Sequence, residues 1–576
     1  MLAASWKWLW LMNDDIKALG SFNPRRILSS GVFPGMKSQE EDADLSGKMV
    51  NSPAEHTNRI RSGPGGGNEG GPRAYSRRQR IGLVLGPILF ILMLIVPEIH
   101  GMDVSAKRMA AVALLMATWW LTEAIPIPAT SLLPIVLFPL LGIMHTKKAT
   151  APYANHLIFL FMGGFIIALA MQRWNLHRRI AMTIVNLIGF SPSRLIFGFM
   201  VATASLSAFV SNTATAVMMM PIGLAIISHV ITEGKKEGLD KEIDFSADKF
   251  AFGLNLMLGI AYAASIGGMA TLIGTPPNTV LAAYLTKTYG YEITFARWLV
   301  VGVPLVLVFL PLCWFYLTRI ANPMKLKKVP GGPELIRKQL SDMGSMSSGE
   351  RWTALVFFLT ALAWIFSKQI GFLFSDPSLV TDATIAMAGA LVLFLIPVDL
   401  KHNQFVMNWD WAVKMPWGVL ILFGGGLALA DGFKETKLAD WIGSQVGLLD
   451  AAPVLILIIA VATLIIFLTE LTSNTATAAM SMPILSAVAV GLGQNPLLLL
   501  IPAAIAASCA FMLPVATPPN AIVFGSGYVT IPQMARSGMG LNLIAIVLIT
   551  ILVYVLVIPG FGIEFNVLPA WISAGS

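Results

Sequence analysis

Two copies of the pentapeptide Ser-Asn-Thr-Ala-Thr supply the residues best suited to binding small ions. They stand at Ser211–Thr215 and Ser473–Thr477, 473 − 211 = 262 residues apart, each inside a long apolar segment. Small polar side chains are costly in such surroundings unless they have partners. Ser, Asn and Thr are favoured helix N-caps, and a helix that starts there directs free N–H groups and its positive dipole end at a ligand. That end suits an anionic group, while the hydroxyl and amide oxygens suit a hard cation such as Na⁺.

A second motif follows each copy. Gly274–Asn278 reads Gly-Thr-Pro-Pro-Asn, and Ala516–Asn520 reads Ala-Thr-Pro-Pro-Asn. Two consecutive prolines interrupt a helix, so we expect a broken helix in both places, with unwound backbone that offers carbonyl oxygens. The second motifs are 517 − 275 = 242 residues apart, and an insertion the size of the charged loop 232–249 accounts for the difference from 262. One copy alone would indicate only a capped polar turn. Paired polar interruptions in two halves of a membrane protein favour a transporter binding site.

The composition is that of a polytopic all-α membrane protein. Of 576 residues, 56% are hydrophobic and 12% charged, and the mean hydropathy is +0.73. A soluble domain carries about 25% charged residues. The net charge of +8 informs topology rather than indicating nucleic-acid binding. The two cysteines give no disulfide framework, and the histidines show no metal-ligand spacing, so no metal beyond sodium is expected.

The order of apolar runs predicts the topology. Arginines at 77–80 place the amino terminus inside. We expect spans at about 81–96, between 108 and 126, and at 129–143, 156–171, 299–320, 353–370, 383–397, 417–430 and 541–557, with re-entrant hairpins at 193–230 and 453–492 and broken helices at 250–289 and 496–524. By this count the first hairpin enters from the cytoplasm, the second enters from outside, and the carboxyl terminus is outside. Such an inverted repeat brings both polar motifs to the middle of the membrane.

Taken together, these motifs resemble the divalent anion/sodium symporter family, the INDY-type carriers of dicarboxylates. The runs Trp119–Pro126 and Thr130–Pro134 add to the resemblance, which covers about residues 80–560. It implies a homodimer in the lipid bilayer, whose protomers have eleven transmembrane helices and two re-entrant hairpins. It also implies an elevator mechanism, in which a transport domain moves as a rigid body against a scaffold.

The resemblance divides the chain into five parts. They are a disordered cytoplasmic tail (1–80), scaffold helices of repeat 1 (81–180), transport-domain elements of repeat 1 (181–320), a cytoplasmic loop with scaffold helices of repeat 2 (321–447), and transport-domain elements of repeat 2 (448–576). Within the tail, the apolar run Trp6–Met12 is too short to span a membrane.

The resemblance also assigns site residues. Sodium would be bound by Ser207, Ser211, Asn212 and Gly274 in one site, and by Thr469, Thr472, Asn474 and Ala516 in the other, the Gly and Ala through their carbonyls. Substrate would be bound by Ser211, Asn212, Thr213, Thr275, Pro276, Ser473, Asn474, Thr475, Thr517 and Pro518. The spacing gives independent support in one place, because Ser207 and Thr469 each lie four residues, or one helical turn, before their motif.

Other polar residues in apolar segments have structural interpretations. Glu470 lies three residues before the second motif, but its counterpart at 470 − 262 = 208 is alanine. We therefore expect Glu470 to pair with backbone or a neighbouring helix rather than to carry protons, and Glu123 to anchor a helix end. The glycines at 163–164 and 424–426, also 262 residues apart, are expected to permit close helix contact.

The expected function is sodium-coupled symport of C4-dicarboxylates such as succinate, fumarate and malate across the cytoplasmic membrane, with more than one Na⁺ bound. The alternatives are a cation-independent dicarboxylate exchanger, or a symporter for citrate, tartrate or sulfate. An anion channel belongs to a different class and would show unitary currents. An enzyme is not expected, since we find no nucleophile–base pair and no nucleotide-binding motif, and hence no catalytic residues.

Overall fold

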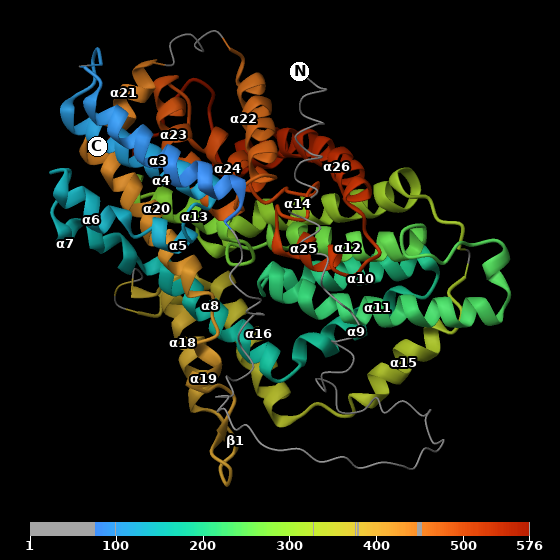
Figure 1. The fold of residues 1–576 in the computed structure, drawn as a ribbon. Helices are drawn as coiled ribbons and strands as arrows, with labels where there is room; N and C mark the ends of the chain where they lie inside the picture. Colours follow the sequence, from blue (N-terminus) through green and yellow to red (C-terminus); the bar gives the residue numbers. More distant parts are fainter. Residues whose placement is uncertain are drawn as a thin grey trace, which may run out of the picture. The chain divides into compact units, whose positions relative to one another are not determined.

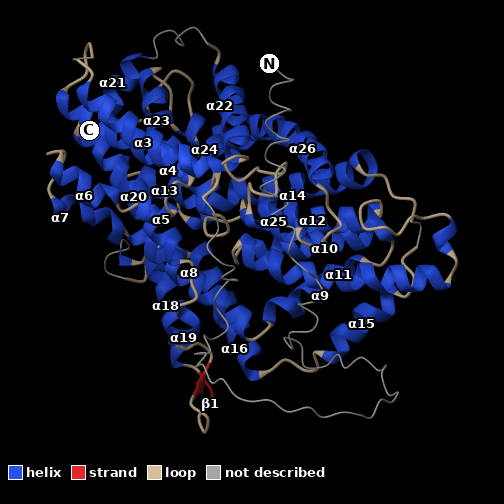
Figure 2. Cartoon of the chain, viewed as in Figure 1, coloured by secondary structure: helices blue, strands red, loops and turns tan. Residues whose placement is uncertain are grey.

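The computed structural model describes residues 75–574 except 98, 327, 375, 377–378 and 446–451. The predicted tail therefore lies outside the described residues up to position 74. The chain divides into two units at Ser76, and the elements below belong to the second, Arg77–Ser576. In the described residues the secondary structure is helical apart from one short β-hairpin (Figure 2).

The elements of the first half run from the first span to the loop after residue 321. They are α3 (Arg77–Ile95), α4 (Val104–Thr122), α5 (Ile127–Thr130), α6 (Leu133–Leu140), α7 (Thr146–Thr150), η2 (Ala151–Ala154), α8 (His156–Arg173), α9 (Leu176–Ile188), α10 (Pro192–Ser207), α11 (Asn212–Lys236), η3 (Leu239–Lys241), α12 (Ala251–Gly268), α13 (Pro276–Tyr289), α14 (Phe295–Phe315) and the π-helical η4 (Tyr316–Ala321). Figure 1 shows α10, α11 and α12 side by side, in agreement with their mutual contacts.

The second half contains counterparts of α10 to η4, preceded by elements that differ from those of the first half. It contains α15 (Gly332–Asp342), α16 (Ser348–Ile365), α17 (Ser367–Gly371), α18 (Asp382–Leu395), β1 (Pro397–Asp399), β2 (Gln404–Phe405), α19 (Trp409–Ala412), α20 (Trp417–Glu435), α21 (Leu438–Ser444), α22 (Val454–Thr469), α23 (Asn474–Gly491), α24 (Leu497–Ala506), α25 (Pro518–Phe524), α26 (Ile531–Leu552), the π-helical η7 (Val553–Val557), α27 (Ile558–Phe561) and α28 (Ala570–Ala574). Strands β1 and β2 pair antiparallel.

The helix boundaries recur at the spacing of the motifs. α10 and α22 begin 454 − 192 = 262 residues apart and end 469 − 207 = 262 apart, and α11 and α23 begin 474 − 212 = 262 apart. α13 and α25 begin 518 − 276 = 242 apart. The next long helix of each half, α14 or α26, starts at a threonine N-cap and ends in a π-helical turn. The internal repeat is therefore structural as well as sequential.

Seven helical segments of the described chain are long and apolar enough to cross a membrane. They are Arg77–Ile95, Thr146–Arg173, Asn212–Lys236, Ala251–Gly268, Phe295–Ala321, Trp417–Glu435 and Ile531–Phe561. Shorter apolar helices include Asp382–Leu395 and Val454–Thr469. Several spanning helices are thus confirmed, while eleven spans, re-entrant hairpins and the inverted orientation stay predictions.

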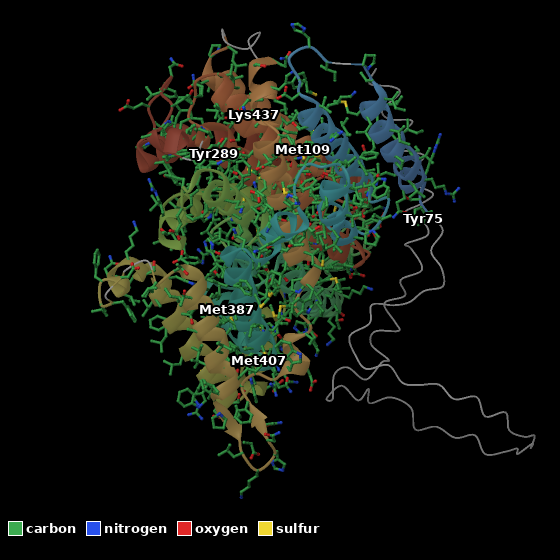
Figure 3. The ribbon with its side chains drawn as sticks, turned by 90° about the vertical axis from the view of Figure 1, so that its left-hand side faces the viewer. Tyr75, Met109, Tyr289, Met387, Met407 and Lys437 are labelled. Atoms are coloured by element: carbon green, nitrogen blue, oxygen red, sulfur yellow. The ribbon has the colours of Figure 1, made fainter. Side chains whose placement is uncertain are left out.

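One local prediction was wrong, and two elements were not predicted. The expected span at 129–143 is instead two short helices, α5 and α6. A proline lies in the first turn of each helix, and Ser131 between them makes hydrogen bonds with side chains from other parts of the chain. Its hydroxyl accepts from Trp120 Nε1 at 3.2 Å, and its carbonyl accepts from the Tyr153 hydroxyl. The amphipathic α15 and the β1–β2 hairpin were not expected. Figure 3 shows Met387 and Met407 toward the end that carries this hairpin, and Tyr289 and Lys437 toward the other end.

Glycines allow the closest helix contacts, as predicted. A Cβ placed on Gly163 of α8 would lie 2.6 Å from the backbone of Ala386 in α18. A Cβ placed on Gly425 of α20 would lie 2.4 Å from the carbonyl oxygen of Ser131. Only glycine fits backbone-to-backbone approaches of this kind.

Candidate functional site

The first Ser-Asn-Thr motif begins α11. Residues 208–211, the first tip, join the end of α10 to this start, and Ser211 is the N-cap, accepting a hydrogen bond from the N–H of Ala214 at 3.3 Å. The second motif begins α23, with residues 470–473 as the second tip and Ser473 at the N-cap position, where its side chain makes no capping hydrogen bond. The predicted helix starts are confirmed, and each directs its free N–H groups at the tip.

The proline motifs interrupt helices, also as predicted. α12 ends at Gly268 and α13 starts at Pro276, which leaves residues 269–275 as the first break. α24 ends at Ala506 and α25 starts at Pro518, which leaves residues 507–517 as the second break. Thr275 and Thr517 are the N-caps of the helices that follow.

Oxygen atoms converge where the first tip meets the first break. Ser207 Oγ donates to the carbonyl of Ala264 at 2.7 Å and, with the Asn212 amide turned so that its nitrogen faces these oxygens, accepts from Asn212 Nδ2 at 2.6 Å. The same amide nitrogen donates to the carbonyl oxygens of Ala264 and Gly274 at 3.1 and 3.3 Å. We call the Ser207 hydroxyl, the Asn212 amide and these two carbonyls the first oxygen cluster. Three oxygens thus surround one side-chain amide, and turning that amide presents its Oδ1 as a fourth oxygen ligand for a cation.

The second half contains a matching group. Thr469 Oγ1 lies 2.7 Å from Asn474 Oδ1 and 2.9 Å from the carbonyl oxygen of Ala507, and it can donate its one proton to either acceptor. These three atoms form the second oxygen cluster. Ser207 and Thr469 are both fully buried, so in each half a hydroxyl one turn before the tip contacts backbone at or just after the end of the helix that precedes the break. Oxygen atoms are the ligands that hard cations take.

The tips are joined to the breaks by different chemistry in the two halves. Glu470 Oε1 accepts from the N–H groups of Phe511 and Met512 at 2.7 and 2.9 Å, and Oε2 accepts from that of Leu513 at 3.2 Å. Asn542 Nδ2 in α26 donates to the same carboxylate at 2.8 Å. The structural role predicted for Glu470 is confirmed.

In the first half the same connection uses a hydroxyl. Thr271 Oγ1 donates to the carbonyl of Ala208 and accepts from the N–H of Gly274 at 3.0 Å. Ala208 is the counterpart of Glu470, and Thr271 is the counterpart of Leu513, since 513 − 271 = 242. The side chain that joins the tip to the break thus belongs to the break in the first half (Thr271) and to the tip in the second half (Glu470).

The two halves meet at these motifs. α11 packs against α25, and α13 packs against α23, so each motif helix contacts a helix of the other half. The hydroxyls of Thr275 and Ser508, one from each break, lie 3.4 Å apart. The hydroxyl of Tyr262 in α12 donates to the carbonyl of Phe511 at 2.8 Å. Both pairs of motifs therefore belong to one central region.

The remaining predicted site residues lie on these tips and breaks or at the starts of the helices that follow them, α11, α13, α23 and α25. Thr213 and Pro518 are exposed, whereas Thr275, Thr475 and Thr517 are buried. The hydroxyl of Thr472 donates to Leu468 O at 3.0 Å and lies 2.6 Å from that of Thr477. Ala516 lies in the second break, where its N–H donates to Leu513 O at 3.2 Å. The assignment of these residues to ligands stays a prediction.

Some residues of this region were not among the predicted site residues. The carbonyls of Ala264 and Ala507 accept from Ser207 and Thr469, and Ser508 contacts Thr275. Asn278 and Asn520 end the two proline motifs and bond to the breaks through their side chains. The last two had a signal in the sequence, their place in a repeated motif. The carbonyls had none, because every residue carries one.

Comparison with known proteins identifies the family. The family profile described as "Sodium:sulfate symporter transmembrane region" matches residues 78–559. The chain belongs to this family. Two transporters from staphylococci are similar to this chain in sequence. One is the "Sodium-dependent dicarboxylate transporter SdcS" of Staphylococcus saprophyticus, 47% identical over 493 residues, which are 85% of this chain and 94% of that protein. Its namesake in Staphylococcus aureus strain USA300 is 47% identical over 497 residues, 86% of this chain and 94% of that protein.

Solved structures with low sequence identity share the fold. The Alcanivorax borkumensis YdaH transporter matches with a TM-score of 0.52 at 13% identity, over 78% of this chain and 98% of that one. The MtrF protein of Neisseria gonorrhoeae matches with a TM-score of 0.53 at 15% identity, over 83% of this chain and 96% of that one. This member of the sodium:sulfate symporter family is an integral membrane protein with the fold of a transporter.

Proposed function

We propose that the protein is a secondary-active carrier that couples uptake of a C4-dicarboxylate, such as succinate, fumarate or malate, to entry of Na⁺. The observation that carries the proposal is the pair of oxygen clusters, in which Ser207 contacts Asn212 at 2.6 Å and Thr469 contacts Asn474 at 2.7 Å at equivalent positions of the two halves. Family membership and the names of the SdcS relatives support the ions and the substrate class.

Each half contributes one cation site and one anion-binding helix end. In the first site Na⁺ is bound by Ser207, Ser211, Asn212 and the carbonyl of Gly274, and in the second by Thr469, Thr472, Asn474 and the carbonyl of Ala516. The substrate carboxylates meet the starts of α11 and α23 through Asn212, Thr213, Asn474 and Thr475, with Ser211, Ser473 and the Thr-Pro pairs 275–276 and 517–518 beside them. Neutral donors and helix ends suit a carboxylate without a permanent countercharge.

Coupling follows from shared residues. Asn212 and Asn474 contact both the cation and the anion in this assignment. Each ligand then lowers the cost of bringing the other out of water, and thermodynamic linkage requires the effect to be mutual. Without Na⁺ the affinity for the dicarboxylate is low, and leak of either ion alone is suppressed.

The proposed architecture is the inverted repeat predicted from the sequence. It has eleven spans, two re-entrant helix pairs (α10–α11 and α22–α23), an intracellular amino terminus and an extracellular carboxyl terminus. Parts 181–320 and 448–576 form the transport domain, which moves as an elevator against the scaffold of parts 81–180 and 321–447 in each subunit of a homodimer. The recurrence of helix boundaries at 262 residues supports two equivalent halves.

Uptake of labelled succinate into proteoliposomes tests the function. We expect uptake driven by an inward Na⁺ gradient and none when choline replaces Na⁺. Asn212→Ala and Asn474→Ala should each abolish uptake while the purified proteins remain monodisperse. Equal uptake in choline contradicts symport, and uptake that requires internal dicarboxylate identifies an exchanger instead.

A second candidate substrate is sulfate, which the description of the matching family profile favours. A dianion with both charges on one small group cannot reach two helix starts as a C4-dicarboxylate does. Competition between labelled succinate and unlabelled sulfate distinguishes the two. We expect excess succinate to inhibit uptake fully and sulfate to inhibit weakly, whereas the reverse order would make sulfate the substrate.

A further inference from the structure

Two asparagines outside the assigned sites hold the breaks in shape. Asn278 and Asn520 occupy the third position of α13 and α25, and both side chains are 0% exposed. Asn278 Nδ2 donates to the carbonyl of Thr271 at 2.8 Å and to that of Gly268 at 3.3 Å. Both acceptors belong to the end of α12 or to the first break.

The second half repeats these bonds residue for residue. Asn520 Nδ2 donates to the carbonyls of Ala510 and Leu513, both at 3.0 Å. The acceptors correspond across the repeat, because 510 − 268 = 242 and 513 − 271 = 242, the same spacing as 520 − 278 = 242. The repeat thus gives an internal replicate of the interaction.

The backbone that Asn278 fastens forms a wall of the first oxygen cluster. A Cβ placed on Gly268 would lie 2.7 Å from the side-chain amide of Asn212 and 3.1 Å from the carbonyl oxygen of Gly274. A Cβ placed on Gly274 would in turn lie 2.5 Å from the carbonyl oxygen of Gly268. Gly268 thus packs closely against the Gly274 carbonyl and the Asn212 amide, so a shift of Gly268 changes the space that these two cluster members have.

Both asparagines also have an unsatisfied atom. In the described part of the chain, Asn278 Oδ1 and Asn520 Oδ1 are buried and have no hydrogen-bond partner. A buried acceptor without a donor is costly, so an asparagine is a poor choice for a position that only needs to be filled. The same cost at equivalent positions indicates that the amide donors are needed there.

We propose that Asn278 and Asn520 are positioning residues for the two cation sites, each fixing the break that supplies a carbonyl ligand and so setting the affinity for Na⁺. The inference rests on the proposed function and adds to it two residues that do not touch the ion. Loss of either donor lets its break relax and enlarges the nearby oxygen cluster. Na⁺ binding weakens, while the helix starts that meet the substrate stay in place.

The experiment compares Asn278→Ala and Asn520→Ala with a matched control, Asn255→Ala. Asn255 lies on α12, is also 0% exposed, and donates to the carbonyl of Asn322 at 2.8 Å, so its loss removes an equally buried amide bond away from the breaks. Purified variants are reconstituted, and succinate uptake is measured against Na⁺ concentration and, at saturating Na⁺, against succinate concentration.

We expect the half-saturating Na⁺ concentration to rise about tenfold in each break variant, the equivalent of about 1.4 kcal/mol, with KM for succinate at saturating Na⁺ little changed. In Asn255→Ala we expect fewer folded molecules and an unchanged Na⁺ dependence. As a readout that does not depend on transport, the rise in melting temperature on replacing choline chloride by NaCl should shrink in the break variants alone.

Several outcomes overturn the inference. One is a wild-type Na⁺ dependence in both break variants, and another is an equal change in Asn255→Ala. Asn278→Ser and Asn520→Ser keep a small donor in case the alanine variants do not fold. If no break variant yields monodisperse protein while Asn255→Ala does, the asparagines serve folding and the proposal is wrong. Failure of the proposed function is seen separately, as wild-type uptake that ignores Na⁺.

Discussion

Lys287 and Asp431 form an ion pair at 3.4 Å between the carboxyl ends of α13 and α20. Next to it, Lys434 Nζ donates to the carbonyl of Thr288 at 3.4 Å. α13 and α20 pack against each other, and Figure 3 shows Tyr289 and Lys437, which follow the ion-paired residues, toward the same end of the molecule. In the proposed division α13 belongs to the transport domain and α20 to the scaffold. The ion pair then crosses the boundary along which an elevator moves, and it must break in each transport cycle.

A crosslink across this boundary should stop transport. We predict that Lys287→Cys combined with Asp431→Cys, treated with a short reducible thiol crosslinker, loses nearly all uptake and recovers it on reduction. The native cysteines, Cys313 and Cys509, are buried and do not compete. The measurement is succinate uptake before crosslinking, after it, and after reduction.

The control for the crosslink is an ion pair within the proposed scaffold. Lys148 pairs with Glu435, and both lie in scaffold parts. Lys148→Cys with Glu435→Cys should crosslink without loss of uptake. Full uptake by the crosslinked variant with Lys287→Cys and Asp431→Cys would show that no moving domain boundary passes between α13 and α20.

The hydroxyls of the oxygen clusters should affect Na⁺ before they affect substrate. Thr469→Val keeps the side-chain shape but leaves Asn474 Oδ1 and the Ala507 carbonyl without their donor, a cost of about 1–3 kcal/mol. We expect a marked rise in the half-saturating Na⁺ concentration for succinate uptake, and near-normal behaviour in Thr469→Ser. Thr360→Val is the control, since Thr360 Oγ1 bonds only within α16, to Val356 O. Normal Na⁺ dependence in Thr469→Val would remove Thr469 from the cation site.

Glu470 should be needed for a folded second break. Glu470→Gln replaces one acceptor oxygen by an amide that cannot accept, so at least one buried N–H group of residues 511–513 loses its partner, at about 1–3 kcal/mol for each. We expect a lower melting temperature and reduced uptake. Glu123→Gln provides the comparison, because its ion pair with Arg78 is half-exposed and contributes about 0–1 kcal/mol. Equal melting temperatures for the two variants would contradict the role given to Glu470.

Two adjacent glycines give a test of helix packing. In Gly163→Ala the new methyl group would meet the Ala386 backbone at 2.6 Å, whereas in Gly164→Ala it would meet the Ile273 side chain at 3.4 Å, an ordinary contact. Overpacking costs about 1–3 kcal/mol, so we expect a lower melting temperature for Gly163→Ala alone. The measurement is thermal unfolding of both purified variants in the same detergent. Similar melting temperatures would mean that α8 and α18 can separate at little cost.

The sequence alone predicted the elements that carry the motifs. Ser211 and Ser473 are caps with strong local preferences, and the proline pairs at 276–277 and 518–519 cannot continue a preceding helix. The spacing of 262 residues then located the helix boundaries in both halves. These signals are local and repeated, and the structure reproduced them.

The features that were missed depend on contacts between distant residues. The carbonyl of Ala264 enters the first oxygen cluster because α12 packs against α10, and no residue type marks such a carbonyl. The prolines around Ser131 were expected inside a span, but the buried bond from Trp120 favours a break there. Asn278 and Asn520 were visible in a motif, yet only the structure shows which carbonyls they bind.

The two tips are joined to their breaks by different side chains, which limits the substitutions that this chain can accept. Thr271 acts through the carbonyl of Ala208, and Glu470 acts through the N–H groups that follow Ala510. Moving either connection into the opposite half therefore requires two substitutions, one in the tip and one in the break, because Thr271 and Glu470 occupy non-equivalent positions. The two halves have equivalent helix boundaries but are not exchangeable, and a carrier built from two copies of either half would contain the same connection twice.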